Sequence, residues 1–574
     1  MKQVPISLVD VLRQRAKEQP DKLVYRFLVD GERDEVVLNY ADLDRRARSI
    51  GALLQSCTRP GDRALLLFPP GIDFIVAFWG CLYARVIAVP AYPPHPVRLE
   101  KSLPIILRII TDARPSVALL TSTLSAAIGS RNEILAAFGK MKLLTAETAE
   151  SGTWAEQWQT PEIGTNDIAF LQYTSGSTSV PKGVVLSHDN LLHNMELIEQ
   201  CFGATEQSQG VLWLPPYHDM GLIGGILQPV YTGAMAILMP PMLFLQRPFR
   251  WLEAISRFRA TVNGAPNFAY DLCVRKIKPE QRELLDLSHW EVAFNGAEPV
   301  YHKTLEQFAD YFAPCGFRPE AFLPCYGVAE ATLLVSGGPK SKPPAQLNLL
   351  NSGLEQNQVI LSPEKQENTR TLVSCGQILA DQQIRIVNPE TLMPSAADEI
   401  GEIWLKGPCV ASSYWNKPLE TDLVFGAYLA NSGEGPFLRT GDLGFLNNGE
   451  LYIAGRIKNL VISGGKNHYA HDLERTVEAA HPAIWPAGCA VFSINNDGPE
   501  RIIVMAEVNV KLIEREDLVI KAIREAIAQH HDLHVDDIQL IPPGGIPKTT
   551  SGKTRHFLCR QSYLDGTLKK LSLI

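Results

Sequence analysis

Apolar and polar positions follow two alternating patterns from the N-terminus to about residue 330. Residues 7–18 and 40–57 carry apolar side chains at helical spacing, and a continuous apolar run follows at 63–68. Short apolar runs bounded by turn residues are typical of strands that are buried on both faces. Further runs predict strands at 86–89, 116–121, 168–173, 211–214, 235–239 and 291–295. The alternation predicts a layered α/β fold with mainly parallel sheets flanked by helices.

The pattern changes in the last third of the chain. Residues 373–455 hold short strand-like runs with turn signals, which predict a β-rich lobe that closes a large N-terminal domain, 1–455. A small α+β domain is expected at 456–574. Its expected elements are a hairpin, a helix at 472–480, strands at 489–494 and 501–509, a helix at about 514–530 and a basic tail.

Composition narrows the class of protein. The length of 574 residues calls for several lobes, and a net charge of −8 gives no support for a nucleic-acid partner. The most apolar window, 74–92, is interrupted by Arg85 and Pro90, so it reads as a buried helix followed by a strand and not as a membrane span. Ten scattered cysteines without a CxxC pair, and an N-terminus without an apolar signal core, favour reduced thiols in a cytoplasmic protein.

The stretch 174–183 is a loop of small residues between the apolar runs 168–171 and 184–186. Its exposed backbone N–H groups, its hydroxyls and Lys182 suit the phosphates of a nucleotide. It is not a Walker A loop, because Pro181 precedes the lysine and a glycine follows it. Taken alone, a surface loop rich in turn formers is about equally favoured.

Further motifs follow in chain order at 295–299, 326–330, 440–442 with 455–456, and 547–553. Each has an ordinary alternative: a strand-to-helix turn with proline at the first helical position, a solvated carboxylate, a Gly-Asp turn and a basic tail. With the small-residue loop, and in this order, they resemble the adenylate-forming superfamily of acyl-CoA synthetases, peptide-synthetase adenylation domains and luciferases. Those enzymes activate a carboxylate with ATP to give an acyl-adenylate and pyrophosphate.

The resemblance implies a nucleotide site. The loop 295–299 would lie against adenine, and the ring of Tyr326 would stack on it. Asp442 would accept hydrogen bonds from the ribose hydroxyls, as an ionised carboxylate can, and Arg456 would reach the ribose or the phosphates. The implied ATP- or AMP-binding residues are Thr174, Ser175, Gly176, Ser177, Thr178, Lys182, Gly296, Ala297, Glu298, Tyr326, Gly327, Asp442, Arg456 and Lys553.

The resemblance also implies a metal site and a catalytic cation. Glu330 would hold Mg²⁺ together with Thr178, since this ion takes few carboxylates and several phosphate or water oxygens. Lys553, and not Lys548, would bridge the substrate carboxylate and the α-phosphate. A cation is needed there because like charges approach each other and the transition state concentrates negative charge on oxygen.

Within the superfamily, the chain is similar to the fatty acyl-AMP ligases. Residues 213–222 match that group's WLPPYHDMGL segment, and 464–469 resembles its RGRNHYP segment. An extra stretch at about 341–371 resembles an insertion that these ligases carry and that coenzyme A ligases generally lack. Such an insertion is expected to pack against the C-terminal domain and limit its swing about a hinge at Lys458, or otherwise to disfavour coenzyme A.

The chain departs from the pattern of that group at a few positions. Gly464 and Lys466 stand where arginine is usual, Ala470 replaces proline, and Asn459 stands where aspartate is common. These departures fall near the expected hinge.

The acyl pocket is expected to be apolar and lined by small residues. The residues assigned to it are His218, Gly221, Gly225, Gly264 and Ala329. Only a positioning role is assigned to His218, beside the carboxylate. Ordinary core packing is the competing interpretation for the apolar residues around them.

The sequence therefore predicts a large multi-lobed N-terminal α/β domain, with two mainly parallel sheets and a β-rich lobe, and a small mobile α+β domain. The implied reaction uses ATP and Mg²⁺ to convert a fatty acid into an acyl-adenylate. The acyl group would pass to an acyl carrier protein or a carrier domain of a polyketide or peptide synthase. An acyl-CoA synthetase and a non-catalytic nucleotide-binding protein are the alternatives.

Overall fold

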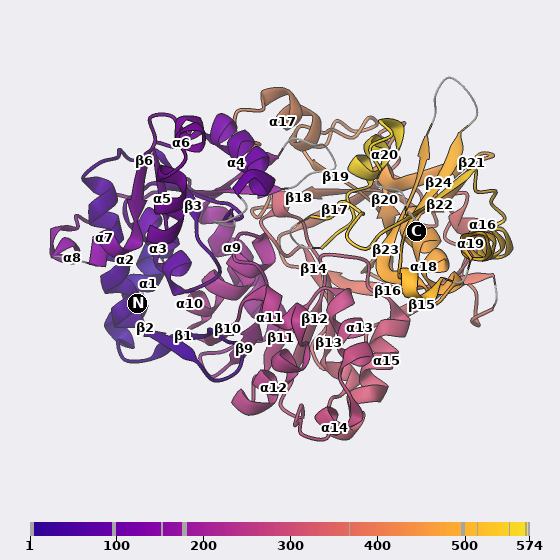
Figure 1. Cartoon of the computed structure of the whole chain (residues 1–574), viewed down its shortest axis with the longest axis horizontal. Helices are drawn as coiled ribbons and strands as arrows, with labels where there is room; N and C mark the ends of the chain where they lie inside the picture. The colour runs from indigo at the N-terminus through magenta and orange to yellow at the C-terminus, as the bar shows by residue number, and fades with distance from the viewer. Residues whose placement is uncertain are drawn as a thin grey trace.

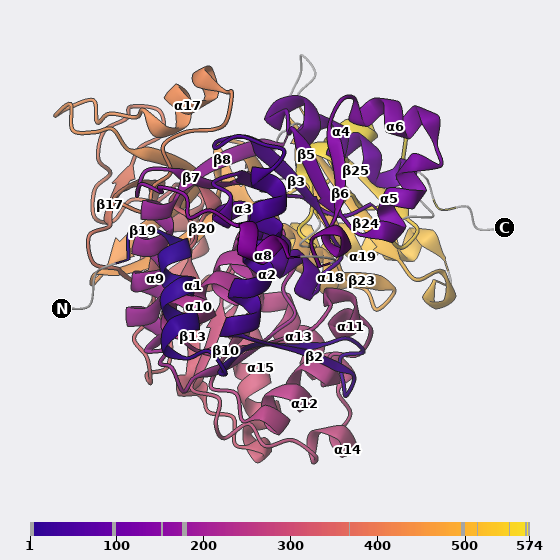
Figure 2. The same ribbon diagram turned by 90° about the vertical axis from the view of Figure 1, so that its left-hand side faces the viewer.

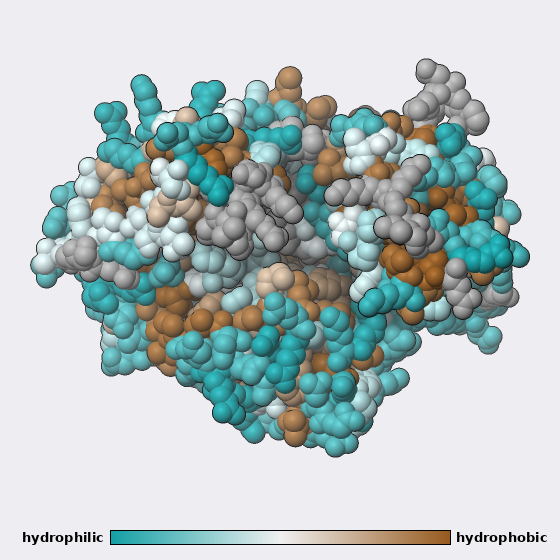
Figure 3. Space-filling model, viewed as in Figure 1, coloured by the Kyte–Doolittle hydropathy of each residue, from teal (hydrophilic) through white to brown (hydrophobic). Residues whose placement is uncertain are grey.

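The computed structural model of the chain describes residues 5–94, 99–150, 153–174, 181–366, 368–494, 500–513, 515–549, 552–568 and 571. Its N-terminal lobe and its C-terminal region (residues 456–574) lie at opposite ends of the long axis, as Figure 1 shows. The space-filling view in Figure 3 shows a hollow between them. The fold is the predicted α/β class with several sheets and a small C-terminal region.

The first sheet lies in the N-terminal lobe and has six strands in the order β6-β5-β3-β4-β7-β8. Its strands pair in parallel, except that β8 runs antiparallel to β7. The strand bounds are β3 (Arg63–Leu67), β4 (Ile87–Pro90), β5 (Val117–Leu120), β6 (Lys142–Thr145), β7 (Ile168–Thr174) and β8 (Lys182–Ser187). All except β6, which was not predicted, match the sequence-predicted strands of this region within two residues at each end.

The continuous apolar runs of this sheet have the expected cause. Along β3, Ala64 and Leu66 pack into one apolar cluster and Leu65 and Leu67 into another, so both faces of the strand are buried. The first cluster contains α1 (Leu8–Glu18), α2 (Tyr40–Gln55) and α3 (Ile72–Tyr83). The second contains residues of α4 (Leu99–Ala113), α5 (Ser122–Gly129) and α6 (Asn132–Phe138). Helices α7 (Ala146–Glu150) and α8 (Trp154–Gln157) pack against α2.

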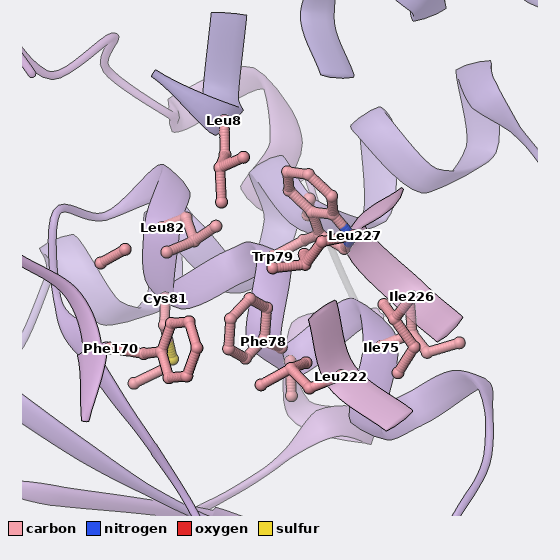
Figure 4. Packing of buried hydrophobic residues seen from close by; sticks show 14 of the residues in the cluster. Leu8, Ile75, Phe78, Trp79, Cys81, Leu82, Phe170, Leu222, Ile226 and Leu227 are labelled. Atoms are coloured by element: carbon pink, nitrogen blue, oxygen red, sulfur yellow. The ribbon is translucent and has the colours of Figure 1, made fainter. Parts of the chain in front are cut away.

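The first cluster also joins the sheet to the next layer. Figure 4 shows Phe78 and Trp79 of α3 facing Leu222 and Leu227, with Phe170 of β7 alongside. Figure 2 shows α1 beside α2 and α10 (Gln228–Thr232), and the contacts between these helices agree. Helix α9 (His188–Phe202) begins with a capping box, in which Ser187 and Asn190 satisfy each other's backbone N–H groups.

The second sheet has the order β2-β1-β10-β9 and is parallel except for β2. Its strands are β1 (Leu23–Leu28), β2 (Glu35–Asn39), β9 (Gln209–Leu212) and β10 (Met235–Leu238). Strand β9 lies beside β11 (Val262–Ala265), the edge strand of the third sheet. Between these two strands, the N–H of Val211 donates to the side-chain oxygen of Asn263 at 2.6 Å. Helices α11 (Pro241–Gln246), α12 (Phe249–Phe258), α13 (Asn267–Lys276), α14 (Pro279–Arg282) and α15 (His302–Phe312) surround this region.

The third sheet joins the parallel strands to the predicted β-rich lobe. Strands β11, β12 (Val292–Asn295) and β13 (Phe322–Tyr326) are parallel, and β14 (Ser336–Gly337) pairs antiparallel with β13. The antiparallel remainder runs β16-β20-β19-β18-β17. Its strands are β16 (Thr369–Ile378), β17 (Gln383–Val387), β18 (Gly401–Lys406), β19 (Leu438–Asn447) and β20 (Glu450–Arg456). The lobe therefore continues the third sheet through β14 and is not a detached sheet.

The predicted insertion, 341–371, forms a flap on this sheet. Strand β15 (Gln346–Leu350) pairs antiparallel with β16, and α16 (Asn351–Leu354) follows it. Leu349 and Leu354 are buried against Phe445 and Tyr452. The second strand expected here, at 357–361, is not a strand: the segment makes only isolated bridges, through Gln358 and Leu361.

The C-terminal region begins at the end of β20. It contains the short helix Ile457–Asn459, the hairpin β21 (Leu460–Ser463) with β22 (Lys466–Tyr469), and α18 (Ala470–Ala480). A sheet of β23 (Ile484–Ile494), β24 (Arg501–Val508) and β25 (Asp537–Ile541) packs on α18 and α19 (Glu516–His531). The expected basic tail is wrong as a description, because it contains β25 and α20 (His556–Leu564). Cys559 of α20 is fully buried, and this apolar contact anchors the segment.

Candidate active site

The small-residue stretch lies between two strands, as predicted, and these strands pair antiparallel. Thr174 at the end of β7 lies opposite Lys182 at the start of β8. The predicted phosphate-binding residues Ser175, Gly176, Ser177 and Thr178, and with them the second metal ligand, lie outside the described residues. The structure thus places Thr174 and Lys182 at the two ends of the loop.

The loop 295–299 follows β12 and does not lead directly into a helix, because α15 begins only at His302. Ala297 has a positive φ of 70°, which turns the backbone sharply after Gly296. The carboxylate of Glu298 accepts a hydrogen bond from the N–H of Phe268 at 2.5 Å. Burial raises the pKa of Glu298 to about 7.

Tyr326 ends β13 beside that loop. Gly327 follows it at a close backbone approach, since a Cβ there would lie 1.7 Å from the carbonyl oxygen of Leu333. The hydroxyl of Tyr326 donates to Oδ2 of Asp442 at 2.8 Å. On the other side, Nε of Arg456 donates to Oδ1 of Asp442 at 2.6 Å. Asp442 and Arg456 face each other on β19 and β20, so sheet register sets this pair.

Glu330 lies in a short helix, Ala329–Ala331, just after Tyr326. Its Oε1 accepts a hydrogen bond from the hydroxyl of Tyr414 at 2.7 Å. The ammonium of Lys182 lies 5.0 Å from the centre of the same tyrosine ring. A single carboxylate near the phosphate loop is a donor set that Mg²⁺ accepts, because phosphate and water oxygens complete its shell. Sequence reasoning missed Tyr414, since nothing in its spacing links it to the recognised motifs.

His218 and Asp219 precede a π-helix, Met220–Leu227, in the segment that resembles the fatty acyl-AMP ligases. π-helical turns are frequent at functional sites. The side chain of Asp219 caps this helix by accepting from the N–H of Met220 at 2.7 Å. Burial lowers the pKa of His218 to about 4, with the charge of Lys553 acting in the same direction, so the imidazole is neutral at pH 7.

Lys553 comes from the C-terminal region and faces these groups. The N–H of Thr549 donates to the carbonyl of Lys553 at 2.8 Å, and the N–H of Lys553 donates to the side-chain hydroxyl of Thr549 at 3.0 Å. Lys553 is exposed by its surface area, but the protein around it displaces enough water to lower the pKa of Lys553. The charge of Arg456 acts in the same direction, and the carboxylates of Asp219, Glu298 and Asp442 act against it. Lys548 instead acts electrostatically on Cys489 of the C-terminal sheet. The fold thus places Lys553 where the carboxylates of Asp219, Glu298 and Asp442 act on its charge.

The residues assigned to the acyl pocket are tightly packed. A Cβ on Gly264 would lie 2.3 Å from the ring of Phe294, and one on Gly221 would lie 2.1 Å from the carbonyl oxygen of Pro215. A Cβ on Gly225 would meet Leu212 at 3.3 Å, and Ala329 is buried. The space beside these glycines is therefore filled by protein in this structure, and their place in an acyl pocket stays a prediction.

An apolar cavity lies beside Gly221. It is lined by residues of β1, α3, β9 and β10 together with the π-helix: Phe27, Ile75, Leu212, Ile226, Leu238 and Met239 are among them.

The insertion holds the C-terminal region through charged contacts. Glu355 accepts from the N–H of Asn467 at 2.8 Å, and its carboxylate pairs with Lys466 at 3.1 Å. Arg370 reaches Asp472 at 2.8 Å and His471 at 2.6 Å. The departure Lys466 thus takes part in the contact with the insertion. The departure Gly464 has φ 58°, a left-handed conformation that glycine adopts without strain.

Lys458, the predicted hinge, lies in the short helix Ile457–Asn459. Partial burial lowers the pKa of Lys458, and the charges of Lys182 and Arg456 act in the same direction. All ten cysteines are free thiols, as expected. Among the described residues, every helix is too short or too polar to span a lipid bilayer.

Comparison with known proteins agrees with this geometry. The family described as AMP-binding enzyme matches residues 12–415, and the family described as Disco-interacting protein 2-like, AMP domain, matches residues 458–572. The medium-chain-fatty-acid–acyl-carrier-protein ligase JamA of Moorena producens is 45% identical, over 98% of this chain and 96% of that protein. The putative fatty-acid–CoA ligase fadD25 of Mycobacterium tuberculosis is 36% identical over the full length of both.

A solved structure gives the same result. The fatty acyl-adenylate ligase of Legionella pneumophila, in complex with acyl adenylate and pyrophosphate, is 42% identical and superimposes with a TM-score of 0.76. The match covers 98% of this chain and 96% of that one. The chain therefore belongs to the AMP-binding, adenylate-forming enzymes, in the group of the fatty acyl-AMP ligases.

Proposed function

We propose that this enzyme activates a fatty acid with ATP and Mg²⁺ and passes the acyl group to the phosphopantetheine thiol of an acyl carrier protein or carrier domain. The observation that carries the proposal is the placement of Asp442 between the hydroxyl of Tyr326 and the guanidinium of Arg456 at the sheet edge. Lys553 of the C-terminal region lies within electrostatic reach of the same aspartate. The similarity to an acyl-carrier-protein ligase and to a ligase structure with bound acyl adenylate supports the substrate class.

In the first half-reaction, a carboxylate oxygen of the fatty acid attacks the α-phosphorus of ATP. The new O–P bond forms as the bond to the bridging oxygen breaks, and pyrophosphate leaves with that electron pair. Lys553 offsets the negative charge that gathers between the carboxylate and the α-phosphate. Neutral His218 orients the carboxylate without adding charge of its own.

The nucleotide would be held by the groups at the sheet edge. Asp442 is kept in place by Tyr326 and Arg456 and would accept from the ribose hydroxyls. Mg²⁺, held by Glu330, would neutralise phosphate charge when bound. Thr174 and Lys182 flank the loop proposed for the phosphates, and Gly296, Ala297 and Gly327 would line the adenine.

In the second half-reaction, the pantetheine thiolate attacks the acyl carbon, a C–S bond forms, and AMP leaves with the electrons of the C–O bond. We propose that residues 456–574 form a mobile domain that turns about Lys458 between the two steps. Free thiols throughout and the use of ATP support a cytoplasmic enzyme.

The decisive experiment is product analysis with ATP, Mg²⁺ and fatty acids of several chain lengths. The expected products are acyl-AMP and pyrophosphate, then acyl carrier protein thioester when the holo-carrier is added. Substantial acyl-CoA from the wild type with free coenzyme A would replace this proposal with an acyl-CoA synthetase, which the similarity to a putative fatty-acid–CoA ligase keeps as the second candidate. Absence of pyrophosphate release with every fatty acid would contradict both.

Removing the insertion sharpens the same assay. Its contacts with Lys466, Asn467 and Asp472 tie it to the C-terminal region. A variant in which about 341–371 is replaced by a short glycine–serine linker should still form acyl-AMP and gain some acyl-CoA synthesis. If both proteins make only acyl-AMP, the enzyme class stands and the insertion is not the barrier to coenzyme A.

A further inference from the structure

A strap, residues 409–417, connects the Glu330 loop to the phosphate hairpin. At its beginning, the N–H of Ala411 donates to the carbonyl of Glu330 at 2.8 Å, and the hydroxyl of Thr332 donates to the carbonyl of Cys409 at 2.6 Å. Further along, the strap pairs with β8. The N–H of Val185 donates to Ser413 at 3.0 Å, and the N–H of Trp415 donates to Gly183 at 2.7 Å.

The far end of the strap is anchored to α4. Asp112 pairs with Lys417 at 3.3 Å and accepts a hydrogen bond from the hydroxyl of Tyr173 at 2.6 Å. Its carbonyl accepts from the side chain of Asn416 at 2.9 Å. Tyr173 is the residue before Thr174, so the same acid ties together the strap and the strand that enters the phosphate loop. The strap is held at both ends and along its length.

Tyr414 lies at the middle of the strap, between the two predicted functional groups. It is buried, its ring packs edge-on against Phe425 at 5.1 Å, and its backbone bridges to Val184. Its hydroxyl reaches Glu330 at 2.7 Å, and its ring face lies 5.0 Å from the ammonium of Lys182. One side chain thus contacts both the carboxylate and the lysine.

The direction of the hydrogen bond is fixed by chemistry. A phenol O–H donates and a carboxylate oxygen accepts, so Tyr414 is the donor of this hydrogen bond. The Glu330 carboxylate must then be the acceptor.

We propose that Tyr414 is a positioning residue that couples the Glu330 carboxylate to the phosphate-loop lysine, Lys182. Its hydroxyl holds one carboxylate oxygen, which fixes the orientation of the group and leaves the other oxygen for a divalent cation on the phosphates. Its ring holds the Lys182 ammonium beside the same phosphates. The inference rests on the proposed function, because it needs a Mg²⁺–nucleotide at this site.

Two substitutions separate the hydroxyl from the ring. Tyr414→Phe keeps the ring and removes the hydrogen bond, which for a charged acceptor should raise the Mg²⁺ concentration for half-maximal pyrophosphate release about tenfold. Tyr414→Leu also removes the ring from Lys182 and should add about a threefold rise in KM for ATP. Tyr428→Phe, at a half-exposed tyrosine of the same lobe, is the matched control and should leave both values unchanged.

A double-mutant comparison tests whether the effect passes through Glu330. In the Glu330→Gln background, Tyr414→Phe should cause little further change in the Mg²⁺ titration, because the carboxylate it positions is already gone. An unchanged titration for Tyr414→Phe alone, or the same tenfold shift in both backgrounds, would overturn the proposal. Thermal unfolding of each variant identifies any loss that comes from misfolding.

A binding measurement separates this proposal from the proposed function. Mn²⁺ binding in the presence of α,β-methylene-ATP, followed by electron paramagnetic resonance, needs no turnover and no fatty acid. Tyr414→Phe should weaken Mn²⁺ binding about tenfold, and Tyr428→Phe should not. If the wild type releases no pyrophosphate with any fatty acid but this shift is present, the proposed substrate is wrong and the role of Tyr414 stands. Equal Mn²⁺ binding by wild type and Tyr414→Phe refutes the role of Tyr414, whatever the substrate is.

Discussion

Two of the places where the C-terminal region meets the rest of the chain differ in character. At the insertion, side chains touch directly: Arg370 contacts Asp472 and His471, and Glu355 contacts Lys466. At the candidate nucleotide site, Lys553 lies in a turn of the C-terminal region, and the carboxylates of Asp219, Glu298 and Asp442 act on its pKa. The first contact holds the region in place, and under the proposed function the second would deliver a cation to the chemistry. The proposed movement of this region between the two reactions would need both a holding contact and a movable catalytic group.

The largest effect is expected on the catalytic side of this comparison. Lys553→Ala removes a charge-assisted contact that is made in the transition state, so acyl-AMP formation should fall by about 10²–10³. Transfer from supplied acyl-AMP to holo-carrier should fall much less. The measurement is each half-reaction in single turnover, with Lys548→Ala as the matched control. Equal loss in both half-reactions would contradict the assignment of Lys553.

A smaller effect, and of a different kind, is expected on the holding side. Arg370→Ala breaks a part-buried ion pair and a hydrogen bond, so the C-terminal region should open more often. Limited proteolysis within 457–459 should become about tenfold faster, with acyl-AMP formation changed less than by Lys553→Ala. Arg370→Lys should recover only part of the protection, because an ammonium lacks the guanidinium fork. Unchanged proteolysis would show that the apolar contacts of the insertion suffice.

The charges around Lys553 predict a pH dependence. Burial raises the pKa of Glu298 to about 7, so this group is protonated below pH 7 and ionised above it. Ionised Glu298 repels the substrate carboxylate and competes for Lys553. The KM for the fatty acid should therefore rise several-fold between pH 6 and pH 8. Glu298→Gln should flatten this profile, and an identical profile in the variant would exclude Glu298 as its origin.

The smallest effect is expected at Lys466. Its ion pair with Glu355 lies at the surface, where solvent screens the charges. Lys466→Ala should change proteolysis and turnover by less than about threefold. A larger change would mean that the hairpin β21–β22 contributes more to holding the region than Arg370 does.

Much of the fold could be predicted because its signals are local. The buried run at 63–68 and the helical spacing at 40–57 correspond to β3 and α2. The prediction failed where local signal was weak. The segment 357–361 looked like a strand but found no continuous partner, and α20 was hidden among basic residues although Cys559 buries it. The π-helix after Asp219 carries no periodic signature that distinguishes it from a core helix.

The candidate site shows the same division. Glu330, Asp442 and Lys553 were recognised because each lies in a short motif whose residue types fit its chemistry. Tyr414 was not recognised, because it acts on Glu330 from 84 residues away and only the pairing of the strap with β8 brings them together. The room predicted beside Gly264 depends on its neighbour, and there the ring of Phe294 fills it.

The sequence by itself determined the order of strands and helices, the motifs and the group of enzymes, because these depend on residue type and spacing within short segments. Only the tertiary structure decided which carboxylates act on Lys553 and that Tyr414 donates to Glu330. It also decided that Glu355 and Arg370 of the insertion contact residues 466–472. Those contacts join residues far apart in the chain, and their geometry is set by sheet register and packing, which no local pattern encodes.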